Sequence, residues 1–172
     1  FDATAIMAYR KLLKNNGEAL GMEKVTLNDM ILFAVSRVIL NHKDLNAHFL
    51  DDKMRIFNNV HLGVATDTER GLMVPTVFGA EKMSLNEISA AAKSVISDAQ
   101  SGKINPDLLK GATFTVSNLG SLGIESFTPI VNPPQTGILG VCGTIDRVRK
   151  GKDGNIEIYP AMGLSLTYDH RA

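Results

Sequence analysis

The sequence predicts an α+β fold in which helices pack on a mixed β-sheet. Two helical segments open the chain, short strand-like runs follow them, and a further helix precedes two long strands. This order lacks the regular strand–helix alternation of a parallel sheet with crossover helices. A nucleotide-binding fold has no support, because no G-x-G-x-x-G follows a strand and no Walker sequence is present.

The composition is that of a globular domain. The 172 residues suffice for one domain with its own core, and 44% of them are hydrophobic and 21% charged. The 18 Lys and Arg residues balance 18 Asp and Glu residues, so no net field attracts nucleic acid or an anionic membrane. No apolar run reaches the roughly 18 residues of a membrane span. We therefore expect an ordinary soluble protein with neither kind of partner.

Two helices are expected in the first quarter of the chain. Residues 2–16 carry apolar side chains at helical spacing, and Asp2 is the expected N-cap. The apolar residues that share one face of this helix are Ile6, Tyr9, Leu12 and Leu13. A second helix is expected over about residues 26–42, where Thr26 and Asp29 have the spacing of a capping box. The run after Asp29 is apolar nearly all round, which predicts deep burial.

The middle of the chain predicts short strands and then a third helix. A capping box from Ser84 to Glu87 begins this helix, and Gly102 ends it. Its apolar stripe consists of Leu85, Ile88, Ala92, Val95, Ile96 and Ala99. Asn105 and Pro106 then have the pattern that begins a short fourth helix. The strands expected before residue 84 form one hairpin around residues 51–53 and a second pair around a turn closed by Gly71; they are residues 47–50, 54–57, 60–67 and 72–77.

The last third of the chain predicts three strands and one long connection. A strand is expected over residues 112–117, and residues 118–135 form a Gly- and Pro-rich connection whose length favours a functional role. Two long strands, residues 138–149 and 155–169, are joined by a short polar turn. Alternate residues of the last strand are apolar, which predicts one buried face; they are Ile156, Ile158, Met162, Leu164, Leu166 and Tyr168.

Few residues are candidates for chemistry. No histidine has the i+3 or i+4 partner that a helical zinc site would show, so a metal site is not expected. The single cysteine excludes an intrachain disulfide and a Cys-rich zinc site. We expect structural or solvated roles for His42, His48 and His61, and a buried, inert thiol for Cys142. His170 differs because it follows a predicted strand and is flanked by the charged residues Asp169 and Arg171. A surface turn would also explain this triplet.

Ser117 is the second candidate. It ends a predicted strand before a glycine-rich loop, and a serine in this place can donate a hydrogen bond to an oxyanion. No G-x-S-x-G surrounds it, so a hydrolase nucleophile is not supported. From the residues alone, the reaction stays open.

Seven segments taken together carry a family resemblance. In chain order they are residues 2–5 (DATA), 63–68 (GVATDT), 70–76 (RGLMVPT), 111–120 (GATFTVSNLG), 129–134 (PIVNPP), 138–140 (ILG) and 169–171 (DHR). This ordered set closely resembles the catalytic core of the dihydrolipoamide acyltransferases of 2-oxoacid dehydrogenase complexes, over essentially the whole chain.

The resemblance implies a fold and an assembly. The fold is the two-layer one of chloramphenicol acetyltransferase, and residues 1–172 are the acyltransferase catalytic domain. The family's signature continues past Asp-His-Arg with two variable residues and Asp-Gly, so we expect the C-terminal part of this domain to lie beyond Ala172. Lipoyl and subunit-binding domains are expected upstream of the chain. The family forms homotrimers with active sites between subunits, which assemble into a cubic or dodecahedral core.

The resemblance also implies a reaction, which is reversible acyl transfer between lipoamide and coenzyme A. His170 matches the catalytic histidine, a general base, and Ser117 matches the serine that stabilises the tetrahedral intermediate. We expect Asn118, Leu119 and Gly120 to line the substrate channel. The lipoyl group belongs to another domain, coenzyme A is a substrate, and no metal is needed. Acetyl is the favoured acyl group, although the stretch from Thr128 to Gln135 also resembles succinyl-transferring relatives.

The implied partners are coenzyme A, an acylated lipoyl domain, further copies of the chain, and the decarboxylase and dihydrolipoamide dehydrogenase components. The implied compartment is the bacterial cytoplasm, or the mitochondrial matrix in a eukaryote. Two alternatives stay open. A catalytically silent scaffold paralogue would lose the histidine, whereas His170 is present. A free-standing chloramphenicol-type O-acetyltransferase typically has His-His where this chain has Asp169-His170.

Overall fold

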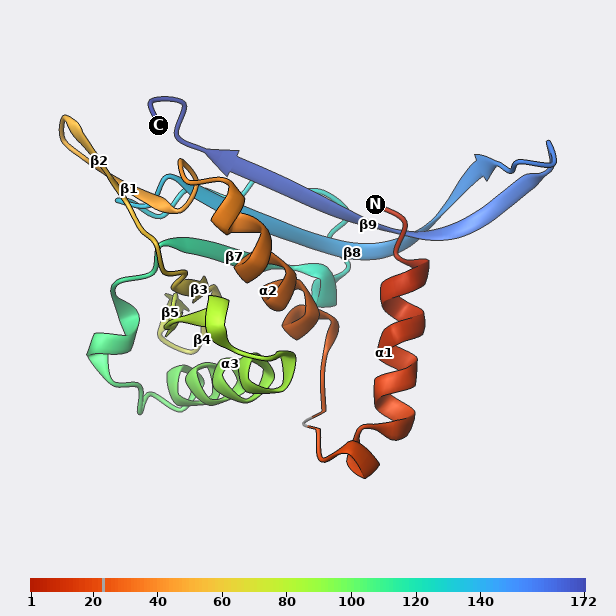
Figure 1. Ribbon diagram of the computed structural model, residues 1–172, viewed down its shortest axis with the longest axis horizontal. Coiled ribbons are helices and arrows are strands. Elements are labelled where there is room, and N and C mark those ends of the chain that lie inside the picture. The colour runs from red at the N-terminus through yellow and green to blue at the C-terminus, as the bar shows by residue number, and fades with distance from the viewer. Residues whose placement is uncertain (23) are drawn as a thin grey trace.

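The centre of the structure is a five-stranded mixed sheet. The structure is a computed structural model, and it describes residues 1–22 and 24–172. The strands follow the order β6-β3-β7-β8-β9, in which β3, β7 and β8 are parallel and the outer strands are antiparallel to their neighbours (Figure 1). They are β3 (Leu62–Val64), β6 (Thr76–Val77), β7 (Phe114–Asn118), β8 (Gly137–Lys150) and β9 (Ile156–Tyr168). The predicted α+β class is therefore confirmed.

Three helices lie along one side of this sheet (Figure 1). They are α1 (Thr4–Asn16), α2 (Leu27–Val38) and α3 (Leu85–Gln100). The core fills the space between helices and strands; its most deeply buried side chains include Leu32 of α2, Ile88 and Ala92 of α3, Leu62 of β3, Val116 of β7 and Val141 of β8. Helices and sheet thus form the two layers that the sequence predicts.

Two of the predicted strands are split. The segment predicted over residues 60–67 divides into β3 and β4 (Thr66–Thr68), and the one over residues 72–77 divides into β5 (Gly71–Met73) and β6. In the second case Pro75 separates the pieces, because proline has no N–H to donate to a ladder. Consequently β3 and β6 join the central sheet, whereas β4 and β5 form a separate hairpin.

The remaining short elements agree with the sequence in outline. The predicted first hairpin is β1 (Ala47–Leu50) with β2 (Lys53–Ile56), and the short helix after Asn105 is a 3₁₀ turn. The 3₁₀ turns are η1 (Glu18–Leu20), η2 (Ile39–Asn41), η3 (Ala80–Lys82), η4 (Pro106–Leu109) and η5 (Gly120–Leu122).

Side-chain caps explain where α2 and α3 begin. Both predicted capping boxes are present, at Thr26 with Asp29 and at Ser84 with Glu87. The N-cap prediction for α1 is wrong, because Ala3 is the N-cap residue. Asp2 pairs instead with Ala161 of β9, while its carboxylate still accepts the N–H of Thr4 at 2.9 Å.

The burial predicted for β9 is largely wrong, whereas that predicted for α2 is confirmed at Met30, Ile31 and Leu32. Of the alternate apolar residues of β9, only Met162 is buried, and Ile156 is 78% exposed. At Ile156 and Ile158 the cause is that β8 and β9 continue as a two-stranded arm beyond the rest of the sheet, away from the three helices (Figure 1). On α2, Ala34 and Val38 are exposed and line an apolar groove together with Leu164 and Leu166 of β9.

Asp29 gives a test of this architecture, because its carboxylate joins two helices. It is buried and accepts hydrogen bonds from the Thr26 N–H at 2.8 Å and from the Ser89 hydroxyl of α3 at 2.9 Å. We expect Asp29→Ala to lower the free energy of unfolding by about 2–3 kcal/mol, since a cap is lost and a buried hydroxyl loses its acceptor. Urea denaturation measures this loss.

The matched control is Glu87→Ala, in the exposed capping box of α3. Its carboxylate accepts from the N–H and the hydroxyl of Ser84 within the same helix start, so we expect a loss of about 1 kcal/mol or less. Equal losses in the two variants would contradict a role for Asp29 between the helices.

Candidate active site

His170 lies on a tight turn that follows β9. The turn is closed by the Ala172 N–H, which donates to the Asp169 carbonyl at 3.0 Å. The Asp169 N–H donates to the Thr136 carbonyl at 2.8 Å, which ties the turn to the segment just before β8. The His170 side chain is exposed, and its ring centroid lies 4.5 Å from that of Tyr168. The chain therefore presents an imidazole to solvent on a backbone that is held in place.

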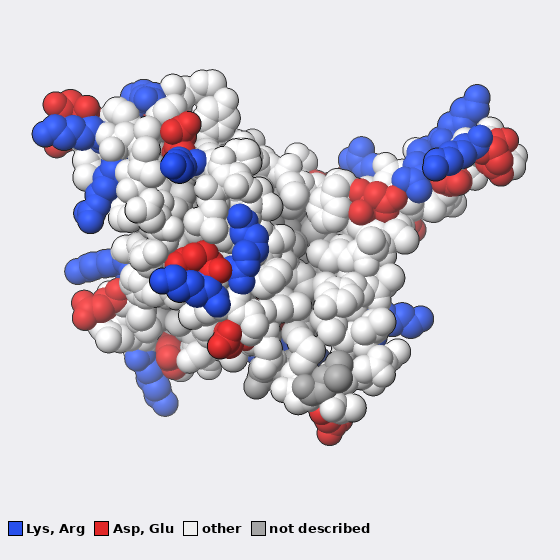
Figure 2. Space-filling view, viewed as in Figure 1, with Lys and Arg blue, Asp and Glu red and all other residues white. Residues whose placement is uncertain are grey.

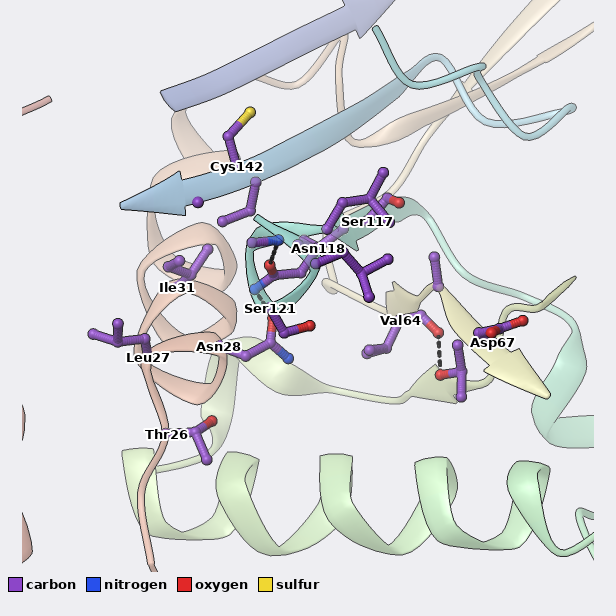
Figure 3. Close-up of a pocket in the computed structure, with 18 of the residues that line it drawn as sticks. Thr26, Leu27, Asn28, Ile31, Val64, Asp67, Ser117, Asn118, Ser121 and Cys142 are labelled. Atoms are coloured by element: carbon purple, nitrogen blue, oxygen red, sulfur yellow. Dashed lines mark hydrogen bonds between the residues drawn. The ribbon is translucent and has the colours of Figure 1, made fainter. Parts of the chain in front are cut away.

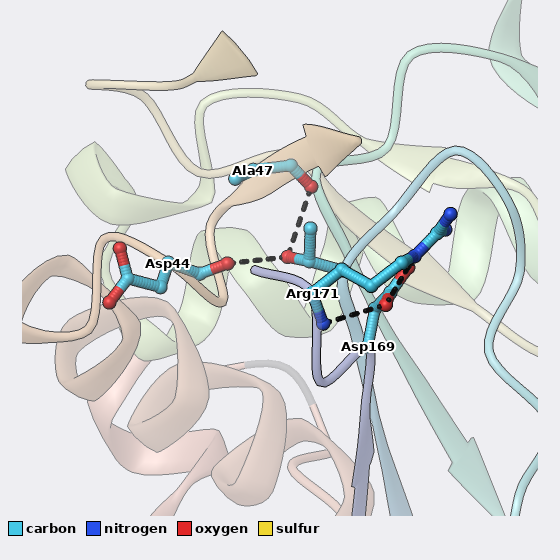
Figure 4. Close-up of polar contacts among 5 residues, drawn as sticks. Asp44, Ala47, Asp169 and Arg171 are labelled. Carbon is cyan, nitrogen blue, oxygen red and sulfur yellow. Dashed lines mark hydrogen bonds and ion pairs between the residues drawn. The ribbon is translucent and has the colours of Figure 1, made fainter. Parts of the chain in front are cut away.

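The residues on either side of His170 bind each other. The Asp169 carboxylate accepts from the Arg171 guanidinium, at 2.6 Å from Nη2 and 2.9 Å from Nε, and from the Arg171 N–H (Figure 4). These hydrogen bonds lower the pKa of Asp169 to about 2. The guanidinium carbon lies 4.3 Å from the centroid of the Phe49 ring on β1. A stable negative and a stable positive charge thus flank the histidine.

Ser117 lies near the end of β7, directly opposite Gly140 of β8. Strand alternation places its side chain on the face of Thr115, opposite to that of Val116 and the helices. The residue is half-buried, and within residues 1–22 and 24–172 no hydrogen-bond partner of its hydroxyl is found. This hydroxyl is therefore available as a donor.

Ser117 and His170 do not meet within one copy of the chain. Ser117 is opposite Gly140, and Gly140 is opposite Ser165 of β9. Two strand spacings therefore separate Ser117 from β9, about 10 Å, and Tyr168 lies about 10 Å further along that strand. At one reacting centre, a general base must lie within about 3 Å of the attacking group whose proton it takes, and an oxyanion donor within about 3 Å of the carbonyl oxygen. One copy of the chain therefore does not assemble both functions in one place.

Asn118, Leu119 and Gly120 lie together on a cavity of about 660 Å³, and Ser117 is at its edge (Figure 3). The cavity lies between the start of α2, the end of β3 and the middle of β8; its other lining residues include Asn28, Val64, Asp67, Cys142 and Met162. Much of this lining is apolar. The sequence prediction thus placed three residues on the wall of one cavity, while their contact with substrate stays a prediction.

Asn118 shapes this wall. Its side-chain nitrogen donates to Oδ1 of Asn28 at 2.9 Å, and its own Oδ1 accepts the Gly120 N–H at 2.9 Å. At Gly120 an added Cβ would lie 2.8 Å from the Cys142 carbonyl oxygen, so only glycine fits there without a shift. The sequence analysis did not identify Asn28, because nothing local indicates its pairing with a residue far along the chain.

The other histidines and the cysteine have structural surroundings. Nε2 of His48 lies 2.8 Å from the Ala112 carbonyl, and Nδ1 of His61 accepts the Gly79 N–H at 3.0 Å. His42 is exposed after η2, and Cys142 is buried. In the described part of the chain, no three His, Cys, Asp or Glu residues are grouped so that they could hold a metal ion. Nor is any helix there long and apolar enough to pass through a membrane.

The fold defines a class of protein. It matches that of chloramphenicol acetyltransferase with a TM-score of 0.53 at 14% identity, over 90% of this chain and 72% of that one, which is a likeness of fold alone. More specifically, the family model for the catalytic domain of the 2-oxoacid dehydrogenase acyltransferases matches residues 1–172. The chain belongs to this family.

Relatives and solved structures agree with this assignment. The acetyltransferase component of the acetoin cleaving system of Bacillus subtilis is 36% identical over 99% of this chain and 43% of its own length. That of the mitochondrial pyruvate dehydrogenase complex of Dictyostelium discoideum is 36% identical over 94% of this chain and 26% of its own length. The chain thus spans less than half of these curated relatives.

Two solved structures have almost the same fold. The dihydrolipoamide acetyltransferase of Azotobacter vinelandii matches with a TM-score of 0.92 and 32% identity, over 99% of this chain and 70% of that one. The study of that protein addresses a serine, a histidine and an asparagine in its catalytic mechanism. The cubic core of a pyruvate dehydrogenase complex matches with a TM-score of 0.91 and 32% identity, over the same shares of the two chains.

The contact between Asn118 and Asn28 gives a test of the cavity wall. We expect Asn118→Ala to lower the free energy of unfolding by about 2 kcal/mol and Asn28→Ala by about 1 kcal/mol, since each removes hydrogen bonds of half-buried groups. The double variant should lose less than the sum, by at least about 0.5 kcal/mol, because the two side chains share one bond.

The control for this test is Asn16→Ala at the exposed end of α1, where we expect a change within about 0.5 kcal/mol. Urea denaturation of all four variants decides it. Additive losses at Asn28 and Asn118 would show that their contact does not stabilise the wall.

Proposed function

We propose that this chain catalyses reversible transfer of an acyl group, with acetyl favoured, between dihydrolipoamide and coenzyme A. The observation that carries the proposal is the exposed His170 imidazole on an anchored turn, in a chain of this acyltransferase family. Acetyltransferase components of acetoin cleaving and pyruvate dehydrogenase systems among its relatives support the choice of acetyl. Because they are more than twice as long as this chain, the activity proposed is that of the natural full-length protein.

The chain's own groups suit a transfer between two thiols. An ordinary imidazole has a pKa of about 6.5, so it accepts a proton near neutral pH. His170 takes the proton from the coenzyme A thiol as its sulfur attacks the thioester carbonyl. The Ser117 hydroxyl donates to the oxyanion of the tetrahedral intermediate. When the intermediate collapses, the carbon–sulfur bond to lipoamide breaks and His170 returns the proton to the departing sulfur. No acyl-enzyme is formed.

The active site lies between copies of the chain in this proposal. The distance between Ser117 and His170 within one copy supports it, because a second copy must supply one of the two residues. A homotrimer with three such sites satisfies this requirement. We further propose that trimers assemble into a larger core, as in the similar cubic core of a pyruvate dehydrogenase complex.

The cavity on the helix side of β7 suits the arm of an extended thioester substrate, whose reacting end would pass the end of β7 to reach the Ser117 hydroxyl on the other face. Both coenzyme A and a lipoyl group end in a long, flexible and partly apolar arm. The apolar residues of the cavity wall, among them Val64 and Met162, would exclude water around such an arm, while Asn28 and Asp67 offer polar contacts. Asn118, Leu119 and Gly120 are the wall residues nearest to Ser117 in the chain. The lipoyl group itself belongs to a separate domain.

The proposed partner proteins and cellular compartment follow from this reaction. An acylated lipoyl domain brings the acyl group, a decarboxylase component loads it, and a dihydrolipoamide dehydrogenase component reoxidises the dithiol. The relatives include bacterial proteins and a mitochondrial one. We therefore propose the cytoplasm for a bacterial source and the mitochondrial matrix for a eukaryotic one.

Single substitutions test the two roles in the full-length protein. We expect His170→Ala to lower kcat about 100-fold or more, because the general base is lost. Ser117→Ala should lower kcat roughly 100-fold and leave KM for coenzyme A nearly unchanged, because its hydrogen bond strengthens only in the transition state.

Transfer from acetyl-dihydrolipoamide to coenzyme A measures both effects, and thermal unfolding checks that the variants are folded. If His170→Ala kept turnover within threefold of wild type, the assignment of His170 as the general base would be wrong. A loss that appears only in KM would make Ser117 a binding residue.

Mixing the two inactive variants tests the shared site. When His170→Ala and Ser117→Ala chains are co-expressed, a random trimer has about a quarter of its sites with both residues intact. We therefore expect about a quarter of wild-type kcat from the mixture, and about 1% or less from either variant alone. No recovery in trimers shown by mass spectrometry to contain both chains would place the complete site within one copy.

A further inference from the structure

We propose that Phe49 of β1 is a positioning residue for His170, which it holds in place through Arg171. This role rests on the acyl transfer proposed above. It concerns the contacts that keep the general base at one position while its own ring stays free to meet a substrate.

The exposed His170 ring contacts the Tyr168 ring and interacts electrostatically with Asp169, so its position depends on its neighbours in the turn. Asp169 is fixed through its N–H, which donates to Thr136. Arg171 is bound to the Asp169 carboxylate, but its side chain is 68% exposed, so water competes for the guanidinium and weakens the pair. The Asp169–Arg171 pair therefore needs a further contact to stay in one arrangement.

Phe49 supplies that contact. The guanidinium carbon of Arg171 lies 4.3 Å from the centroid of the Phe49 ring, and a cation over an aromatic ring is attracted to its negative face. The planar guanidinium lies over the ring while its nitrogens bind Asp169, so one side chain makes both contacts.

The Phe49 backbone is fixed to the segment that also holds the turn. Its N–H donates to the Pro134 carbonyl at 2.8 Å, and the Thr136 N–H donates to the Ala47 carbonyl at 3.1 Å. The Thr136 hydroxyl donates to the Asp44 carbonyl at 2.6 Å (Figure 4). Residues 134–136 thus bind β1 on one side and Asp169 on the other. The aromatic ring and the histidine turn are placed by the same short segment, which keeps their separation constant.

The contact between Phe49 and Arg171 affects catalysis, because the reaction rate falls steeply when a general base is misplaced. Without the ring, Arg171 would leave its place above β1 more often, and the turn would carry His170 with it. Substrate binding would change little, since Phe49 does not line the cavity beside Ser117.

The test is Phe49→Leu in the full-length protein. We expect kcat for acetyl transfer to fall about fivefold, the upper end of what an exposed cation–π contact contributes, with KM for both substrates unchanged. Phe49→Tyr keeps an aromatic face and should stay within twofold of wild type. Leu50→Ala, an exposed neighbour on the same strand, is the matched control for a general loss of the hairpin and should also stay within twofold.

A double-mutant cycle tests whether Phe49 acts on His170 through Arg171. In an Arg171→Gln background, Phe49→Leu should lower kcat no further, because the contact is already gone. A further fivefold loss in that background would overturn the route through Arg171. An unchanged kcat for Phe49→Leu in an active enzyme would overturn the positioning role itself.

Hydrogen exchange gives a measurement that does not need the reaction. The N–H groups of Arg171 and Ala172 are bonded within the turn, so we expect Phe49→Leu to speed their exchange about fivefold, and Leu50→Ala to leave it unchanged. If the wild-type protein transferred no acyl group, the proposed function would fail and this exchange would decide alone. Unchanged exchange at both groups would overturn the inference in either case.

Discussion

The pairing of β8 with β9 is the interaction on which the rest of the structure depends. Its register runs from Gly137 opposite Tyr168 to Lys150 opposite Ile156. This register sets how far Ser117 lies from the histidine turn, and it brings the end of β9 beside Thr136. A slip by one residue would turn every side chain of β9 to the other face. The same slip would separate the Asp169 N–H from its acceptor, the Thr136 carbonyl. The pairing of β8 with β9 therefore also sets the position of His170.

One irregularity in this ladder builds the cavity wall. Between Val141 and Thr144 the register shifts, so that β8 carries an extra residue, as in a β-bulge. The bulge turns the Gly143 N–H out of the ladder, and it donates to the Ile124 carbonyl at 2.7 Å. The Leu119 N–H donates to the Val141 carbonyl at 3.0 Å nearby. The loop after β7 is therefore attached to β8 at two points, and this attachment closes one side of the cavity beside Ser117.

Local signals in the sequence predicted the elements well, and contacts between distant residues account for what it missed. Thr26 and Ser84 begin their helices through capping boxes that span only four residues, so the local sequence pattern contains the whole interaction. The alternation in β9 predicted the strand correctly but not its burial, because burial depends on what lies against the strand. Among the site residues, the family resemblance singled out His170 and Ser117, whereas nothing in the sequence connects Asn28 to Asn118 or Phe49 to Arg171. Those pairs depend on the packing of separate elements.

The arm formed by the far ends of β8 and β9 has a consequence for solubility. Toward its tip, beyond the contact of β9 with residues 1–3, the structure describes no further strand beside the arm, and Val148, Ile156 and Ile158 are exposed there. An edge without a neighbouring strand is a template on which identical strands stack into aggregates. The arm carries Arg147, Arg149 and Lys150 along β8, and charged atoms cover its tip (Figure 2). Charged side chains of both signs on this edge hinder its pairing with another copy, because such pairing would remove them from water.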